Sequence, residues 1–361
     1  MPKRDSPEKT RRGRAAKGNK APTVYDVARL AKVSIFTVSA IVNNKGQVSP
    51  ALQRRVAAAI QKLNYRPNLL ARGLAARQTG TIGIIITDIS NPFFPEVVRA
   101  TEDEAERRGY NILLCNSDNH EEKERKYLEV LLSKRVDGIV MNKAPGRHAA
   151  EFRRMLAEAN VPLLLLMRTI PEWDADAVLT DDRQAAYDAV CHLARVGHRT
   201  IAYVGGPLNI SNAEARMDGY QAALKDCGLR FDRKLAVNGN YRIDSGYTAG
   251  LQLLPYRPDA VLIANYLMAV GWMRAAQDLQ MRCPQDFGLI SFDDHPWLDC
   301  FHPRLTTVDL PKYELGAAAI RILLERVAAV KAGQTPEPVT LTMAARLRVR
   351  ESCGFMQRNR A

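Results

Sequence analysis

Polar and aromatic side chains recur directly after short apolar runs in the part of the chain beyond residue 80. Carboxylate, amide and guanidinium groups hydrogen-bond to neighbouring hydroxyls, and aromatic rings stack on a ring face, so this mixture suits a sugar or a similar polar ring. The candidate ligand-binding residues are Asp88, Asn91, Phe93, Phe94, Arg168, Asn212, Arg216, Tyr241, Asn265, Tyr266 and Asp293.

A second candidate surface lies in "VYDVARLAKVSIFTVSAIVNN", residues 24–44, which reads as two short helices joined by a tight turn. On a helical wheel the second helix buries Val38, Ile41 and Val42, turns Phe36, Ser39, Ala40 and Asn43 outward and leaves Ile35 at the edge of the outer face; Thr37 joins Ser39 and Asn43 as a polar group. Outward polar groups can bond phosphates, and outward apolar groups can contact the thymine methyl. For Ile35 and Phe36 a second interpretation stays open, namely packing on the core of this small domain.

The sequence offers little support for catalysis. Ser291, Asp293 and His295 are spaced i, i+2, i+4 at the end of an apolar run, which does not bring three groups together, and no nucleophile elbow surrounds the serine. Neither GxGxxG nor GxxxxGK[ST] occurs. The six cysteines lie far apart without a CxxC pair, so we expect no metal, no cofactor and a reducing, cytoplasmic location.

The positive charge is concentrated at one end of the chain. Residues 1–80 hold 17 Lys and Arg against 3 Asp and Glu, whereas residues 81–361 hold 35 against 36. A basic module on a near-neutral body indicates a polyanion partner such as nucleic acid. The basic N-terminus lacks the apolar core of a signal peptide, and no apolar run approaches the roughly 18 residues of a membrane helix, so we expect a nucleoid-associated protein without a membrane partner.

Residues 1–21 form a basic arm that we expect to be disordered. Two regions with different patterns of apolar residues follow it. Helices are predicted at 24–31, 35–42 and 50–64, with Thr23, Ser34 and Ser49 as N-caps and Pro50 at the first helical position. They predict a helix-turn-helix domain over residues 22–66, joined by a linker at 67–79. From residue 80 apolar runs alternate with amphipathic stretches, which predicts parallel, doubly wound α/β sheets in two lobes.

These motifs, in this order, resemble the lactose/galactose-repressor (LacI/GalR) family of bacterial transcription regulators. The markers include "TVYDVARLAKVSIFTVSAIVN", "YRPNLLARGL", "TIGIIITDISNPFF", "GHRTIAYVGGP", "SFDD" and "LTTV". The resemblance implies an all-α helix-turn-helix headpiece, a hinge helix and a two-lobed effector domain like a periplasmic sugar-binding protein. It implies a repressor that binds double-stranded, palindromic operator DNA as a homodimer, controlled by a small carbohydrate effector.

The resemblance also implies domain limits. The effector and dimerisation domain is expected over residues 80–352, with the chain crossing between lobes near 179, 309 and 338. One lobe then takes residues 80–178 and 309–337, and the other takes 179–308 and 338–352. The tail, residues 353–361, shows no leucine heptads, which favours a dimer over a tetramer. The alternative is a sugar-binding protein or an enzyme on the same α/β fold, without a role on DNA.

Individual sites follow from the matching positions. The implied DNA-binding residues are Thr23, Tyr25, Ser34, Ile35, Phe36, Thr37, Ser39, Ala40, Asn43, Asn68, Arg72 and Leu74. Many family members have Arg where this chain has Ala40, so the operator is expected to present thymine where others present guanine. Leu74 matches the leucine that wedges into the minor groove. The family's effector positions match Phe93, Arg216, Tyr241, Asn265 and Asp293, whereas Tyr266 stands where the family usually has Asp.

Overall fold

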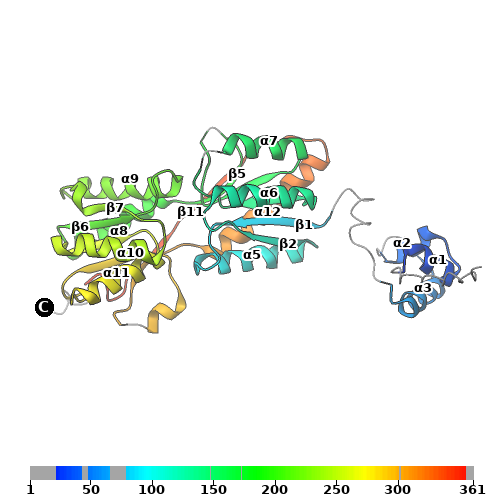
Figure 1. Ribbon diagram of the computed structural model, residues 1–361, viewed down its shortest axis with the longest axis horizontal. Coiled ribbons are helices and arrows are strands. Elements are labelled where there is room, and N and C mark those ends of the chain that lie inside the picture. Colours follow the sequence, from blue (N-terminus) through cyan, green and yellow to red (C-terminus); the bar gives the residue numbers. More distant parts are fainter. Residues whose placement is uncertain are drawn as a thin grey trace, which may run out of the picture. The chain divides into compact units, whose positions relative to one another are not determined.

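The computed structural model describes residues 22–42, 48–65, 79–146, 148–171, 173–300 and 302–354. The chain divides into two compact units, one ending at Arg77 and the other beginning at Gln78 (Figure 1). The predicted basic arm, most of the predicted hinge and the DNA-binding candidates Asn43, Asn68, Arg72 and Leu74 lie outside the described residues. In the described part of the chain, no helix is both long and apolar enough to cross a membrane.

The first unit is a bundle of three helices, α1 Val24–Ala31, α2 Ile35–Val42 and α3 Pro50–Leu63. The predicted N-caps are confirmed in position: the Asp26 carboxylate accepts a hydrogen bond from the Thr23 backbone N–H at 2.9 Å, and Ser34 Oγ accepts one from the Thr37 N–H at 3.1 Å. Each satisfies a backbone donor that the first helical turn leaves without an intrahelical partner. Pro50 stands at the first position of α3, as predicted.

One apolar face of each helix forms the core of this unit. The buried side chains are Val27, Ala28, Ala31, Val38, Val56 and Ala59. Arg55 on α3 holds the bundle together from the outside, because its guanidinium donates to the carbonyl oxygen of Ala31 at 2.6 Å and to that of Lys32 at 3.1 Å. A cation at the carboxyl end of a helix also offsets the helix dipole, so Arg55 stabilises α1 by two effects.

The second unit contains two six-stranded sheets. The first has the order β11-β5-β4-β3-β1-β2 and the second the order β12-β10-β9-β8-β6-β7. The strands are β1 Thr81–Ile86, β2 Asn111–Asn116, β3 Gly138–Met141, β4 Leu163–Leu166, β5 Asp176–Thr180, β6 Ile201–Gly205, β7 Ala236–Asn238, β8 Ala260–Ile263, β9 Gly288–Phe292, β10 Thr306–Asp309, β11 Thr340–Met343 and β12 Arg346–Arg348. Neighbouring strands are parallel except β10 and β12, which are antiparallel. The predicted pair of doubly wound lobes is confirmed.

Helices cover both faces of each sheet (Figure 1). They are α5 Phe93–Arg107, α6 Glu121–Ser133, α7 Ala149–Ala159, α8 Asp182–Val196, α9 Ser211–Asp226, α10 Ile243–Leu253, α11 Tyr266–Asp278 and α12 Lys312–Lys331, with short 3-10 turns at η1 Arg233–Leu235, η2 Leu254–Tyr256 and η3 Pro296–Cys300. On β1, Ile82 and Ile84 pack toward α5 and α12, whereas Ile85 packs toward α6. Burial on both faces explains why such strands read as continuous apolar runs.

The chain crosses between the lobes three times, and only the third crossing lies away from its predicted position. The first follows β5 at Thr180 and the second follows β10 at Asp309, against the expected 179 and 309. The third comes after Met343 rather than near 338, because residues 340–343 pair with β5 and belong to the first sheet. The first lobe therefore holds residues 79–180 and 312–343, and the second holds 182–309 and 346–354.

The predicted start of the tail at residue 353 is also wrong. The Cys353 side chain is fully buried in the apolar core, and its carbonyl oxygen accepts a hydrogen bond from His198 Nε2 at 2.9 Å. A free cysteine behaves as a small apolar side chain, so the core continues through this position. The ordered second lobe extends at least to Gly354, and only residues 355–361 lie outside the described part at this end.

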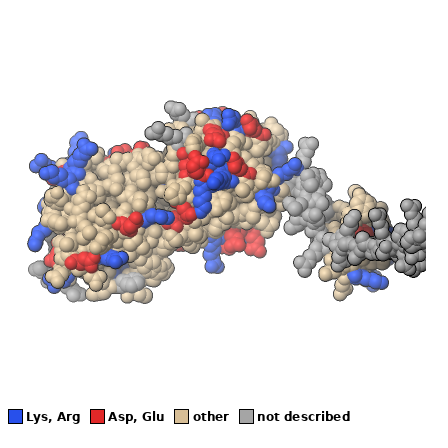
Figure 2. Space-filling model, in the orientation of Figure 1, with Lys and Arg blue, Asp and Glu red and all other residues tan. Residues whose placement is uncertain are grey.

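Charges of both signs gather over α6 and α7 on the face shown in Figure 2. Lys123 lies close to Asp118, and Arg125 donates to Glu129 at 2.5 Å. Exposed pairs of this kind contribute at most about 1 kcal/mol each. Their mixed signs fit the near-neutral charge of residues 81–361, and this face presents no single-sign surface for a polyanion.

Candidate functional site

The carboxyl ends of the strands in both sheets meet at one cavity between the lobes. The space is about 630 Å³, its opening to solvent included. It is lined by Thr87, Asp88, Asn91, Phe93, Phe94, Asn119, Asn142, Met167, Arg168, Asn212, Arg216, Asn240, Tyr241, Arg242, Asn265, Asp293 and Leu310. Ligands of open α/β sheets bind at this end of the strands, so the position of the cavity is that of a small-molecule site.

Ten of the eleven candidate ligand-binding residues line this cavity, and Tyr266 does not. Asn265, one residue earlier, caps α11 and turns the chain away, so the Tyr266 ring packs against other aromatic rings. Its centroid lies 4.8 Å from that of Trp297 and 5.6 Å from that of His295. Tyr266 therefore belongs to an aromatic cluster of the second lobe with His295 and Trp297.

Seven lining residues were not among the candidates: Thr87, Asn119, Asn142, Met167, Asn240, Arg242 and Leu310. Each also follows a strand, so the same sequence signal marks them. Asn142 is buried, and both ends of its amide are occupied: Oδ1 accepts from Thr87 Oγ1 at 3.0 Å and Nδ2 donates to the Leu166 carbonyl at 2.9 Å. It ties the end of β3 to the ends of β1 and β4.

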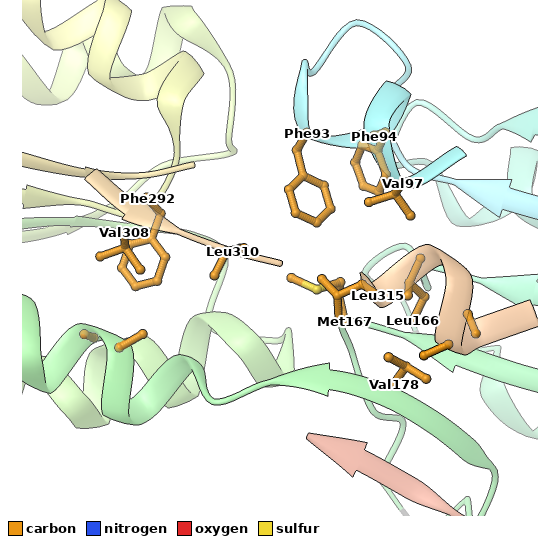
Figure 3. Close-up of a cluster of buried hydrophobic side chains, with 14 of the residues drawn as sticks. Phe93, Phe94, Val97, Leu166, Met167, Val178, Phe292, Val308, Leu310 and Leu315 are labelled. Atoms are coloured by element: carbon orange, nitrogen blue, oxygen red, sulfur yellow. The ribbon is translucent and has the colours of Figure 1, made fainter. Parts of the chain in front are cut away.

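Apolar side chains form the floor of the cavity. Figure 3 shows Phe93 at the start of α5 pointing toward the gap between the lobes, with Met167 and Leu310 on the side opposite the ring. Phe93 and Phe94 meet edge to face, with centroids 5.2 Å apart. The exposed face of an aromatic ring in such a place can stack on a pyranose or furanose ring.

Arg216 is held rigidly from α9. Its Nε donates to Asp182 Oδ1 at 2.6 Å, its Nη1 donates to the Ala264 carbonyl, and its Cζ lies 3.9 Å from the centroid of the Phe292 ring. Burial lowers the pKa of this group, but the Asp182 carboxylate and its hydrogen bond, together with Tyr241 and Asp293, raise the pKa above its usual value. The guanidinium stays charged and fixed in orientation, which is what recognition of a polar ligand requires.

Asp293 lies at the end of β9 and is almost completely buried. Burial raises the pKa of its carboxyl group, and the nearby positive charges of Arg216 and Lys312 oppose that rise. Its backbone is left-handed, with φ of 74°. Asn119, Met167 and Tyr241 also line the cavity with φ of 63°, 65° and 65°. Backbone strain in non-glycine residues concentrates at functional sites, so this grouping marks the cavity independently of its side chains.

Three buried polar atoms in the cavity wall make no hydrogen bond within the described residues. They are Arg168 Nε, Asn212 Oδ1 and Tyr241 Oη. The Tyr241 ring lies against Gly206, where a Cβ atom would come within 2.1 Å of it, so only glycine at 206 leaves room for this ring. An unsatisfied buried polar group costs about 1–3 kcal/mol, and a polar ligand or water in the cavity would satisfy all three.

The first unit presents an exposed apolar surface on α1 and α2. The Phe36 side chain is 83% exposed, and Tyr25 and Ile35 are exposed as well. Packing on the core of the unit therefore does not explain Phe36. Thr37 and Ser34 are within hydrogen-bond distance of each other at 2.9 Å, so the start of α2 is well formed. Among the predicted contacts, Ile35, Phe36, Ser39 and Ala40 lie along one helix with at least part of each side chain exposed.

Known protein families match both units. Residues 23–68 match the family described as bacterial regulatory proteins, lacI family, and residues 190–353 match a periplasmic binding protein-like domain. Catabolite control protein A of Priestia megaterium is 40% identical over 305 residues, which cover 83% of this chain and 91% of that protein. The ribose operon repressor of Escherichia coli K12 is 38% identical over 307 residues, 84% of this chain and 93% of the relative.

A solved structure aligns with most of this chain. The lac repressor dimer bound to operator and the anti-inducer ONPF aligns over 92% of this chain and 99% of its own, with a TM-score of 0.81 and 28% identity. Two relatives that match over most of their length are named as repressors: the ribose operon repressor and the HTH-type transcriptional repressor PurR of Vibrio atlanticus, which is 36% identical over 308 residues, 84% of this chain and 92% of that protein.

Proposed function

We propose that this chain, which belongs to the lacI family of bacterial regulatory proteins and is thus a DNA-binding regulator of transcription, binds a palindromic operator. A sugar or sugar derivative bound in the interlobe cavity controls the affinity for that operator. The observation that carries this proposal is the cavity itself. Aromatic rings line it, and so do residues with buried polar atoms that have no hydrogen-bond partner among the described residues. The ribose bound in a family member from Enterococcus faecium, 29% identical, supports a carbohydrate.

We further propose that the operator-binding form is a homodimer. Strand β2 is an edge strand of the first sheet, and the adjacent residues Leu113 and Leu114 are both exposed on it. An exposed apolar edge strand invites pairing with another chain, so soluble proteins usually cover such an edge. The dimeric state of the aligned lac repressor supports a second copy as the cover.

The test of this function uses the full chain and two assays. Genomic fragments selected by the protein are expected to share a two-fold symmetric site, whose half-sites mirror the symmetry of the dimer. Titration of carbohydrates into the complex with labelled operator is expected to change the DNA affinity for one ligand or one small set. An asymmetric selected site would contradict the dimeric arrangement, and a response to none of the carbohydrates would contradict the proposed effector.

The exposed Phe36 ring leads to a specific prediction about the operator. We expect each half-site to hold a thymine whose methyl group contacts this ring, because the methyl is the one apolar group in the major groove. Replacing that thymine by uracil should cost on the order of 1 kcal/mol, the value of one buried methyl group. The Phe36→Ala variant should bind more weakly and lose the uracil penalty.

The measurement is a double-mutant cycle, in which wild type and Phe36→Ala are each titrated against thymine and uracil operators at one salt concentration. The matched control is Tyr25→Ala, which removes another exposed ring of the same unit. Its uracil penalty at the Phe36-dependent thymine should equal that of wild type. If Phe36→Ala also keeps the wild-type penalty at every half-site thymine, the ring does not read thymine.

A further inference from the structure

Arg168 differs from every other buried cation in the described residues. Four Lys and Arg side chains count as buried there: Lys143, Arg168, Arg216 and Lys312. Lys143 pairs with Glu121 and Glu124, Arg216 pairs with Asp182, and Lys312 pairs with Asp309 and Glu96. No carboxylate of the described part lies within the 4.0 Å limit of an ion pair from Arg168. A buried charge without a partner is strongly unfavourable, so its presence needs an explanation.

The contacts of Arg168 leave one edge of its guanidinium open. Nη1 donates to the Lys143 carbonyl at 2.5 Å and lies 3.5 Å from Asn119 Oδ1. Nε has no hydrogen-bond partner, and the described residues supply none for Nη2. The Nε–Nη2 edge is the one that grips a carboxylate or a phosphate through two parallel hydrogen bonds. Arg168 lines the cavity, and its Nε is a buried donor in that wall, so the edge is open in the sense that no protein group occupies it.

The carboxylates in and around the cavity interact with groups other than Arg168. Glu124 is within electrostatic reach of Arg168, but its carboxylate lies 2.8 Å from Lys143 Nζ. Asp88 Oδ1 accepts hydrogen bonds from the Ser90 N–H at 2.9 Å and from Ser90 Oγ at 2.6 Å. Asp293 is under the influence of Arg216 and Lys312. Burial lowers the pKa of Arg168, and the nearby Tyr241, Glu124 and Asp182 offset that effect only in part.

The residue beside Arg168 contributes no charge either. Met167 ends the first lobe's β4 run and lines the cavity with an apolar side chain, as Figure 3 shows. The cavity thus combines an uncompensated cation on one wall with amide, hydroxyl and carboxylate groups that suit a polyol. We propose that the effector is an anionic sugar derivative, a hydroxylated ring that carries a carboxylate or a phosphate, and that the open edge of Arg168 binds this anionic group. This inference rests on the carbohydrate effector proposed above.

The test measures binding of matched ligands to the full-length protein by calorimetry. The probes are three series that share a ring: glucose, glucuronate and glucose 6-phosphate; galactose, galacturonate and galactose 6-phosphate; ribose and ribose 5-phosphate. One anionic member is expected to bind at least about tenfold more tightly than its neutral twin, the effect of one charge-assisted contact. Whether the uronate or the phosphate binds identifies which anionic group the cavity accepts.

Three variants assign that preference to Arg168. Arg168→Gln is expected to reduce the preference for the anion to less than about threefold, and Arg168→Lys should keep part of it because the charge remains. The matched control Arg154→Gln removes an exposed arginine on α7 and should keep the whole preference. The lysine variant retains a buried cation, so it keeps the test decisive if the glutamine variant does not fold.

Different failures point to different errors. A neutral sugar that binds as tightly as its anionic twin overturns this inference and leaves the proposed carbohydrate effector standing. An anion preference that survives in Arg168→Gln overturns the role of Arg168. If no member of any series binds, the carbohydrate effector itself is contradicted, and the anionic sugar with it.

Discussion

Replacing Arg216 by alanine is expected to abolish the response to the effector and to destabilise the second unit by about 3–5 kcal/mol. The effector response should disappear because a buried donor group in the cavity wall is lost. The free energy of unfolding should fall because Asp182, which is equally buried, is left without its cation. A loss of this size is a large part of the roughly 5–15 kcal/mol that stabilises a typical domain.

A second substitution separates the two effects. In the double variant Arg216→Ala with Asp182→Asn, the stranded charge is removed, so most of the stability should return while the effector response stays lost. Unfolding in urea measures the stability. The anisotropy of labelled operator, followed as the effector is added, measures the response. A wild-type change in DNA affinity of the double variant at the wild-type effector concentration would show that Arg216 is only a structural partner of Asp182.

The second large effect is expected from Gly271→Ala, on the order of 3 kcal/mol of lost stability. Helices α10 and α11 cross at this glycine so closely that a Cβ atom would lie 2.0 Å from the Ile243 carbonyl oxygen and 2.5 Å from the Tyr247 nitrogen. Both obstacles are backbone atoms, so relief requires the helices to move apart. Gly246 faces the same crossing, where its own Cβ would lie 2.1 Å from the Met268 carbonyl oxygen.

The same substitution should weaken effector binding, although Gly271 does not line the cavity. The crossing of α10 and α11 keeps Asn265 beside Tyr241, whose carbonyl oxygen accepts a hydrogen bond from Asn265 Nδ2 at 2.9 Å. Separation of the helices lengthens that bond and shifts both side chains. Thermal unfolding and effector titration test this together. The control Gln277→Ala changes an exposed residue of α11 and should stay within about 0.5 kcal/mol of wild type. A Gly271→Ala protein with wild-type unfolding would contradict the close crossing.

The apolar runs of the sequence predict the central strands, because strands covered on both faces must be apolar along their whole length. The observed β1, β3, β4, β6, β8 and β9 all lie in such runs. Strands β11 and β12 have no such signal: they are short edge strands whose residues are mostly exposed. Their extended form is decided by hydrogen bonds to β5 and β10, which are distant in the sequence. The misplaced third crossing is a direct result.

The candidate site was predictable to the extent that strand ends mark it. Residues such as Arg216 and Asp293 follow apolar runs and do face the cavity. The sequence does not predict which residues act as hydrogen-bond or ion-pair partners of these side chains. Asp182 is the partner of Arg216 and comes from another helix, 34 residues earlier. Arg168 has no carboxylate partner among the described residues because of where the carboxylates lie in three dimensions, and local sequence patterns do not predict that arrangement.

The interleaved path of the chain sets where genes of this family can be recombined. The first unit is continuous in sequence, so one breakpoint is enough to join its coding segment to another effector domain. The lobes are not continuous: α12 and β11 of the first lobe are encoded between β10 and β12 of the second. A chimera made with one breakpoint at residue 181 would force α12 of one parent onto the sheet of the other. Exchange of a complete lobe therefore needs three breakpoints, at residues 181, 310–311 and 344–345, where the connecting segments are shortest.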